Sequence, residues 1–310
     1  LSKGSALLLA VSGGQDSMAL LKIILDLIRI YEWKVFIWHG DHGWHQESNL
    51  IANELQAWCK SKGLNFYSDK ADNKTTHSEA AAREWRYSCL TNKASEISEQ
   101  NAAHQETIVL TGHTASDRVE TLIFNLSRGS DLSGLCSLSE SRTLHEKIRL
   151  VRPFLSFSRT ETARICEEFN FPIWLDPTNQ NNNLSRNKIR HEIIPVLEKL
   201  HPGSTLRISE MSDRISKKKD IEEELAHLSL KSIKLNNGIC RQKLNKISFN
   251  TRITLLAYWL KTFDVPSLNA KSLKELSIHL GPHKPPGSKR LGKGWEIRWI
   301  KNLITIEKSN

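Results

Sequence analysis

Short apolar runs alternate with stretches of helical periodicity over the first 170 residues. The apolar runs predict strands at Ala6–Val11, Lys34–His39, Asn65–Tyr67, Thr107–Thr111 and Ile148–Val151. The stretches between and after them predict helices at Ser17–Tyr31, Glu47–Lys62, Ser78–Ile97, Ser116–Leu126 and Ser158–Phe169. This alternation indicates stacked βαβ units and a parallel sheet, which makes the first part of the chain an α/β domain.

The pattern changes in the second half of the chain. Asp176–Arg190 contains many asparagines and a proline, so we expect a loop there. A helix with apolar residues at helical spacing follows, in which Pro195 introduces a kink. Residues 204–264 read as mostly helical, Gly281–Gly294 as a loop, and the stretch from Trp295 as a closing β-hairpin. Two domains are therefore expected, residues 1–190 and a smaller, mostly helical domain at residues 191–310.

Composition narrows the class of protein. The 310 residues are 39% hydrophobic, which is sufficient for real cores, and no run of about eighteen apolar residues predicts a membrane helix. The net charge of +10 favours a polyanionic partner, most simply a nucleic acid. The five cysteines form no C-x-x-C pair, so neither a disulfide framework nor a thiolate zinc site is expected, and a reducing compartment fits: Cys59, Cys89, Cys136, Cys166 and Cys240.

The stretch LLLAVSGGQDSMALL places two glycines between the first strand and the first helix. Gly13 and Gly14 allow phosphate oxygens to approach the main chain, and the amides of the following helix face the anion. Ser12 and Ser17 add hydroxyl donors, and Asp16 can orient the loop or hold Mg²⁺. The lysine of the G-x-x-x-x-G-K-[ST] loop is absent, which suits a pyrophosphate better than γ-phosphoryl transfer.

The S-G-G-x-D-S motif is similar to that of the PP-loop ATP pyrophosphatases, which cleave ATP between the α and β phosphates. The resemblance implies a Rossmann-like fold of the adenine nucleotide alpha hydrolase type and ATP as cosubstrate. It also implies that ATP contacts residues of the loop and of neighbouring strand ends: Ser12, Gly13, Gly14, Gln15, Asp16, Ser17, His42 and Gly112.

Two carboxylates follow the fourth predicted strand. Asp117 and Glu120 are spaced i, i+3, on one face of the next helix, near the expected ATP. They form a pocket for a cationic group or simply complement the N-terminus of their helix, and the spacing alone leaves both interpretations open.

The segment Thr111–Leu135 resembles that of the tRNA(Ile)-lysidine synthetases. These enzymes join L-lysine to C2 of the wobble cytidine of tRNA(Ile) with a CAU anticodon, which changes codon reading from AUG to AUA. The resemblance implies that Asp117 and Glu120 bind lysine. The chain departs from the common pattern at Ser116, where the family often has an acidic residue, and at Arg118, which replaces a frequent glutamine.

Two arginine-bearing segments, SEAAAREWRYSCL and LSRNKIRHEIIPVLEKL, also resemble this family. Arg83 is expected to stabilise charge during adenylation, with Asp16 as the other catalytic residue, and Arg86 to bind tRNA. Arg186 and Arg190, spaced i, i+4, are further tRNA-binding candidates. Surface ion pairs or a solvated basic helix face are the simpler explanations of these arginines.

His39, His42 and His45 have a regular spacing that suggests a metal site, but the flanking glycines indicate a loop past the second strand.

Together, the motifs lead us to expect an ATP- and Mg²⁺-dependent tRNA ligase. The alternatives are a PP-loop enzyme that thiolates tRNA, or a nucleotide-binding module without catalysis. A cytoplasmic location is expected, or the plastid stroma. The sequence does not define the oligomeric state, although members of the family are often homodimers.

Overall fold

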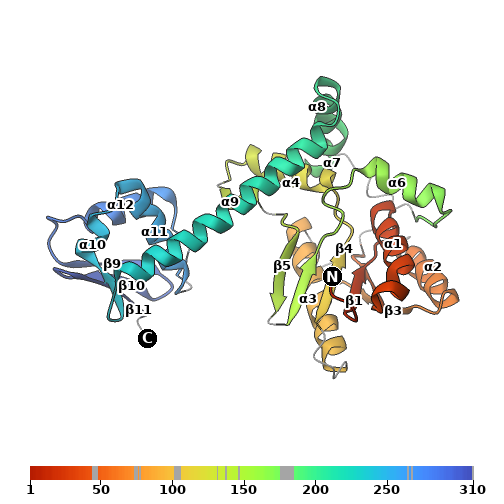
Figure 1. The fold of residues 1–310 in the computed structure, drawn as a ribbon, viewed down its shortest axis with the longest axis horizontal. Helices are drawn as coiled ribbons and strands as arrows, with labels where there is room; N and C mark the ends of the chain where they lie inside the picture. Colours follow the sequence, from red (N-terminus) through yellow and green to blue (C-terminus); the bar gives the residue numbers. More distant parts are fainter. Residues whose placement is uncertain are drawn as a thin grey trace. The chain divides into compact units, whose positions relative to one another are not determined.

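The computed structural model describes residues 1–43, 48–72, 76, 78–100, 106–130, 132–136, 138–145, 147–174, 185–263, 265–266 and 268–308. These residues divide into two compact units, Leu1–Ser216 and Lys217–Asn310 (Figure 1). Most of the loop expected at 176–190 lies outside the described residues. Within the described part of the chain, no helix is both long and apolar enough to cross a membrane.

The first unit is built on a six-stranded sheet in the order β3-β2-β1-β4-β6-β5. The bounds are β1 Ala6–Ala10, β2 Lys34–Asp41, β3 Asn65–Lys70, β4 Thr107–Thr111, β5 Ser141–His145 and β6 Ile148–Val151. All neighbours pair in parallel except β5, which is antiparallel to β6. The expected α/β class and parallel sheet are confirmed. The β5 edge was not predicted, because its polar sequence SRTLH lacks the apolar pattern of a buried strand.

Helices cover both faces of this sheet, which is why β1 is apolar at every position. Leu7 and Leu9 pack in one core with α1 (Gln15–Tyr31), α2 (Ser48–Ser61) and α6 (Arg159–Glu168). Ala6 and Leu8, which alternate with them, pack on the opposite face with α3 (Glu79–Gln100). The two faces can be followed in Figure 1.

The strand order reverses at β1. From β1 the chain proceeds outward to β2 and β3, then returns through α3 to β4 on the other side of β1. In such open sheets ligands bind at the carboxyl ends of the strands beside this switch point. Here that edge carries the glycine loop after β1, residues 42–43 after β2, and the start of α4 (Ala115–Ser127) after β4. The short α5 (Leu132–Leu135) follows α4.

The segment after residue 184 packs on α4. It comprises α7 (Ser185–Lys188), a π-helical turn η2 (Ile189–Ile193) and α8 (Ile194–Leu200), which begins next to Pro195. Proline has no backbone N–H to donate to a carbonyl of the preceding helical turn. The wider π-helical turn accommodates this missing hydrogen bond. Ile189 and Ile194 share a small core with Val119, against which Ile208 packs. The division between the units therefore falls at Ser216/Lys217, within α9 (Ser204–Ile233), instead of near residue 190.

The second unit combines helices with an antiparallel sheet. After α9 come α10 (Arg241–Asn245), α11 (Phe249–Lys261) and α12 (Ala270–His279). The sheet order is β7-β8-β11-β10-β9, with bounds Lys234–Leu235, Gly238–Cys240, Leu303–Lys308, Trp295–Trp299 and Gly287–Gly292. The expected hairpin is confirmed as β10–β11. The prediction of a loop at 281–294 is wrong in its second half, where the structure has strand β9. Leu291 of this strand is buried in the core, and its charged neighbours are typical of an edge strand.

Candidate functional site

A cavity of about 370 Å³ opens at the carboxyl ends of β1, β2 and β4, within the size range of small-molecule sites. It brings together most of the predicted ligands from five separate segments of the chain. They are Ser12, Gly14, Gln15, Asp16, Ser17, His42, Arg86, Gly112, Asp117 and Arg190. Gly13, Arg83, Glu120 and Arg186 are not among its described lining residues.

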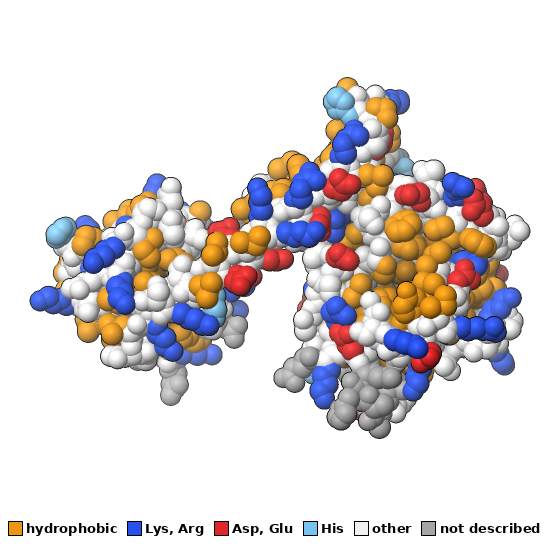
Figure 2. Space-filling model, viewed as in Figure 1, with side chains coloured by type: hydrophobic (Ala, Val, Ile, Leu, Met, Phe, Trp, Pro, Cys, Tyr) orange, Lys and Arg blue, Asp and Glu red, His pale blue; other side chains and the backbone are white. Residues whose placement is uncertain are grey.

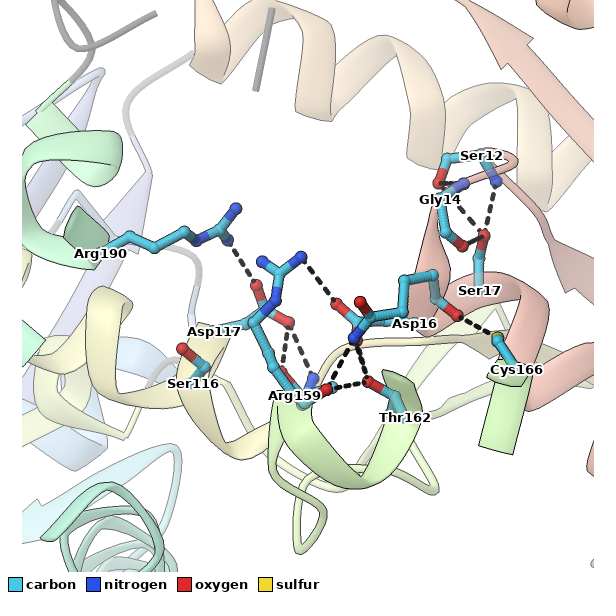
Figure 3. Close-up of polar contacts among 12 residues, drawn as sticks. Ser12, Gly14, Asp16, Ser17, Ser116, Asp117, Arg159, Thr162, Cys166 and Arg190 are labelled. Carbon is cyan, nitrogen blue, oxygen red and sulfur yellow. Dashed lines mark hydrogen bonds and ion pairs between the residues drawn. The ribbon is translucent and has the colours of Figure 1, made fainter. Parts of the chain in front are cut away.

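The glycine loop forms a compact turn held by its own serines (Figure 3). The Ser17 hydroxyl donates to the Gly14 carbonyl at 2.8 Å, and the Ser12 amide donates to the Ser17 hydroxyl at 3.2 Å. Gly13 has a φ of +87°, a left-handed conformation that favours glycine. Gly14 caps α1 without any side-chain hydrogen bond, so the first amides of α1 are left for a ligand.

Gly112 allows the end of β4 to lie directly against the loop. A Cβ atom at this position would stand 2.8 Å from the backbone oxygen of Asp16, closer than real contacts allow. A glycine is therefore required for the end of β4 to approach the first turn of α1, and its role is to shape the cavity wall.

Asp16 points away from the loop toward the N-terminus of α6. Its carboxylate accepts a hydrogen bond from the Thr162 hydroxyl at 2.5 Å and lies 3.7 Å from the Arg159 guanidinium. Burial raises the pKa of Asp16, and the positive charge of Arg159 opposes this shift. The Gln15 amide donates to the Arg159 carbonyl at 2.7 Å and to Thr162 at 2.8 Å. Gln15 thus joins the loop to α6.

The carboxylates of α4 are paired with Arg190. The Arg190 guanidinium donates to both oxygens of Glu120, at 2.6 and 2.9 Å, and to Asp117 at 3.1 Å. Ser116 donates to the same Glu120 carboxylate at 3.3 Å. Burial raises the pKa of Glu120, and the hydrogen bond from Arg190 opposes the rise. Arg190, predicted to bind tRNA, thus forms one cluster with Asp117 and Glu120, which were predicted to bind lysine. The sequence did not indicate this cluster.

Asp117 has a second contact. Its carboxylate accepts a hydrogen bond from the Thr114 backbone amide at 2.8 Å, which satisfies a free donor at the start of α4. The helix-capping interpretation of this residue is therefore confirmed, and the same side chain still lines the cavity.

The arginines of α3 lie beside aromatic rings at the cavity edge. Arg86 lies 3.0 Å from the ring Nε2 of His42, and both line the cavity. Arg83 lies over the Tyr87 ring at 5.2 Å, and Arg152 donates to the Tyr87 hydroxyl at 3.2 Å. This arrangement places several positive charges next to the cavity. Elsewhere, Arg186 is half-buried on α7.

The cavity is also lined by His113 and Arg159, which were not predicted from the sequence. His113 follows Gly112, and its Nδ1 lies 2.8 Å from the Thr111 hydroxyl. Burial lowers the pKa of His113 to about 3, with neighbouring arginines contributing, so the imidazole is neutral. Its position directly past a strand end was the available signal. Arg159 had no such signal, because α6 reaches the loop only through tertiary packing.

The regular spacing of three histidines suggested a metal site, which the flanking glycines argued against. The buried His39 ring lies 2.8 Å from the Val11 carbonyl, and His45 lies outside the described residues. No cluster of three or more metal-ligating side chains occurs among the residues that the structure describes.

Comparisons with known proteins agree with this architecture. A family model described as "PP-loop domain" matches residues 2–197. A tRNA(Ile)-lysidine synthase of Prochlorococcus marinus is 51% identical over 303 residues, covering 98% of this chain and 90% of the relative. A relative from Pyropia yezoensis, "tRNA(Ile)-lysidine synthase, chloroplastic", is 34% identical and covers 87% and 84%. Among solved structures, the U34-tRNA thiolase NcsA from Methanococcus maripaludis superposes with a TM-score of 0.57 at 18% identity, over 69% of this chain and 73% of that one.

Proposed function

The chain belongs to the tRNA(Ile)-lysidine synthase family of PP-loop proteins, and from this premise we propose how its described residues carry out the reaction. It is an ATP-using ligase that forms a carbon–nitrogen bond in tRNA(Ile). One observation supports the assignment of residues most strongly. The glycine loop, Asp117 and Arg190 line a single cavity at the switch point of the sheet.

ATP occupies the glycine loop. The uncapped amides of α1 and the hydroxyls of Ser12 and Ser17 bind its phosphates, with His42 and Gly112 in the surrounding wall. The carboxylate of Asp16 is a suitable ligand for Mg²⁺, which is held in such sites by one or two carboxylates together with substrate phosphates. When bound, Mg²⁺ neutralises phosphate charge.

The tRNA base is activated in the first step. The C2 oxygen of the wobble cytidine in the CAU anticodon attacks the α-phosphate, and pyrophosphate leaves. The cytidine then carries AMP on that oxygen, which turns a poor leaving group into a good one. Arg83 and Arg86, with Arg152 behind them, supply positive charge at this edge of the cavity.

The second step joins L-lysine to the activated base. Its amine attacks C2, the bond to the adenylate oxygen breaks, and AMP leaves. Asp117 and Glu120 bind a cationic group of the lysine. Because Arg190 already pairs with both carboxylates, incoming lysine either shares them or displaces the guanidinium.

The attacking amine must lose a proton. His113 lines the same cavity, but the burial that lowers its pKa to about 3 also makes its imidazole a weak base. The proton of the amine therefore passes to water and not to this imidazole.

The net positive charge resides in the second unit, which we propose as a tRNA-binding module. Lys217–Asn310 contains 19 lysines and arginines against 8 aspartates and glutamates, whereas residues 1–216 contain 25 and 26. Figure 2 shows these basic side chains spread over the visible face of the unit. Phosphate contacts from such a surface position an RNA without reading its sequence. Arg186, on α7 of the first unit, is proposed as a further phosphate contact.

We further propose a cytoplasmic location, with the plastid stroma as the alternative, since the modified tRNA serves translation in either compartment. A homodimer is proposed as the assembly.

The test is direct. The protein is incubated with ATP, Mg²⁺, radiolabelled lysine and a CAU-anticodon tRNA(Ile), and label is expected in the RNA together with stoichiometric AMP and pyrophosphate. A tRNA with a GAU anticodon is the matched control and should remain unlabelled. Sulfur incorporation into the same RNA in place of lysine would overturn the assignment.

The thiolation alternative receives no support from the cysteines. Cys59, Cys136, Cys166 and Cys240 are buried, and none of the five lines the described wall of the cavity. Burial raises the pKa of Cys59 and of Cys166 to about 11, so neither thiol is a ready nucleophile.

A further inference from the structure

The side chain of Arg159 lines the nucleotide cavity. It stands at the first position of α6, lines the same wall as Asp16, and leaves 39% of its side chain exposed. Its ion pair with Asp16 spans 3.7 Å, beyond hydrogen-bonding distance. Among the described residues, its guanidinium donates no hydrogen bond. Figure 3 shows the side chain directed at Asp16, between that residue and Asp117.

The backbone of Arg159 is fixed relative to the glycine loop. Gln15 donates to its carbonyl at 2.7 Å, and Thr162, one helical turn along, bonds to both Gln15 and Asp16. The α6 helix therefore cannot shift without moving the loop. The guanidinium itself has no comparable restraint, so it can turn toward a ligand while its Cα stays in place.

The other cations of the cavity are already engaged. Arg190 makes three hydrogen bonds to the carboxylates of α4, and Arg86 contacts His42. The short loop lacks the lysine that other nucleotide loops supply to the β and γ phosphates. Yet pyrophosphate gains negative charge when its bond to the α-phosphate breaks. A planar guanidinium with free donors suits such an anion, because it can bind two phosphate oxygens at once.

We propose that Arg159 is the cation that binds the pyrophosphate portion of ATP and stabilises it as the leaving group. Without nucleotide, the Asp16 carboxylate holds the guanidinium near the loop. With nucleotide, the guanidinium turns to the β and γ phosphate oxygens. This assignment rests on the proposed function, since it requires cleavage between the α and β phosphates.

The variants Arg159→Gln and Arg159→Lys test the assignment. Arg164→Gln is the matched control, because Arg164 lies on the same helix, 76% exposed, and pairs with Glu168. Calorimetry measures the affinities of ATP, pyrophosphate and AMP. Loss of charge-assisted hydrogen bonds predicts that Arg159→Gln weakens ATP and pyrophosphate about 10- to 100-fold and AMP less than about 3-fold. Arg159→Lys should retain part of the affinity, and Arg164→Gln all of it.

Equal weakening of AMP and ATP would overturn the proposal, because it would indicate that Arg159 only supports the loop. Unchanged affinity for all three ligands would overturn it as well. The wild-type labelling assay separates this result from a failure of the proposed function. If lysine does not enter tRNA, the activity is wrong; if lysine enters and Arg159→Gln binds pyrophosphate normally, only the role of Arg159 is wrong.

Discussion

Arg190 and Glu120 form a two-point ion pair, in which guanidinium nitrogens lie 2.6 and 2.9 Å from the two carboxylate oxygens. The Glu120 side chain is only 3% exposed and that of Arg190 22%. Removing one partner of such a pair leaves an uncompensated charge in a poorly solvated place. The pair therefore fixes the segment after residue 184 on α4 and sets the charge of the proposed lysine pocket.

The first prediction concerns this pair. Arg190→Gln should lower the free energy of unfolding by about 2–4 kcal/mol in urea titrations, below the range for full burial because Arg190 is partly exposed. Arg164→Gln, which breaks an exposed pair, should leave the free energy of unfolding nearly unchanged. The double variant Arg190→Gln, Glu120→Gln should lose less than the sum of the single changes. Strict additivity would mean that the two side chains do not interact.

The second prediction separates lysine binding from helix capping. Asp117→Asn should raise the KM for lysine about 10- to 100-fold, while tRNA-dependent release of pyrophosphate continues. Glu161→Gln is the control, because Glu161 caps α6 through the Ser158 amide at 2.7 Å, as Asp117 caps α4. If both variants lose lysine affinity alike, or if pyrophosphate release stops in Asp117→Asn, the carboxylate is not a lysine ligand.

The third prediction follows from the low pKa of His113. Between pH 6.5 and about 3, the unfolded chain binds a proton at this histidine and the folded chain does not. The free energy of unfolding should therefore fall as the pH drops below 6.5. In His113→Asn this contribution disappears, so the change in stability between pH 7 and pH 5 should be smaller. An unchanged slope in His113→Asn would contradict a neutral imidazole in this half-buried position.

The fourth prediction tests the basic second unit. Affinity for tRNA should fall steeply with salt, because binding to phosphates releases counterions. Replacing the exposed Lys284, Arg290 and Lys301 by glutamine should reduce the slope of log affinity against log salt by about 2, since each phosphate left without its cation accounts for roughly 0.7–0.9. The same change at Arg29, Lys60 and Lys62, exposed in the first unit, should leave the slope unaltered. Equal effects of the two sets of substitutions would indicate that the overall charge of the protein, and not the second unit, accounts for tRNA binding.

Local pattern was enough to predict the part of the site that is continuous in sequence. The loop from Ser12 to Ser17 follows directly from a buried strand, two glycines and a helix, so its position at a strand end could be read from order alone. Arg159 and Arg190 could not be placed in this way. They reach the cavity from segments more than 140 residues further along the chain, through packing of α6 on α1 and of η2 on α4.

Two strands were missed because their sequences are polar. β5 and β9 are edge strands, and edges carry charged and small residues that discourage pairing with other chains. Such sequences resemble loops. For the same reason the sequence indicated a mostly helical second domain, where the structure has a five-stranded antiparallel sheet beside the helices.

The π-helical turn at Ile189–Ile193 sets the direction in which the Arg190 side chain leaves the backbone. A π turn holds one residue more than the α-helical turn it replaces, so it is equivalent to a single inserted residue. Deleting one residue within the turn would therefore restore α-helical winding while Arg190 still faced the carboxylates and Ile194 its core. Winding the present residues as a regular α-helix would instead rotate one side of the segment away from the other. A relative that is one residue shorter here can keep the same arginine in its amino-acid pocket.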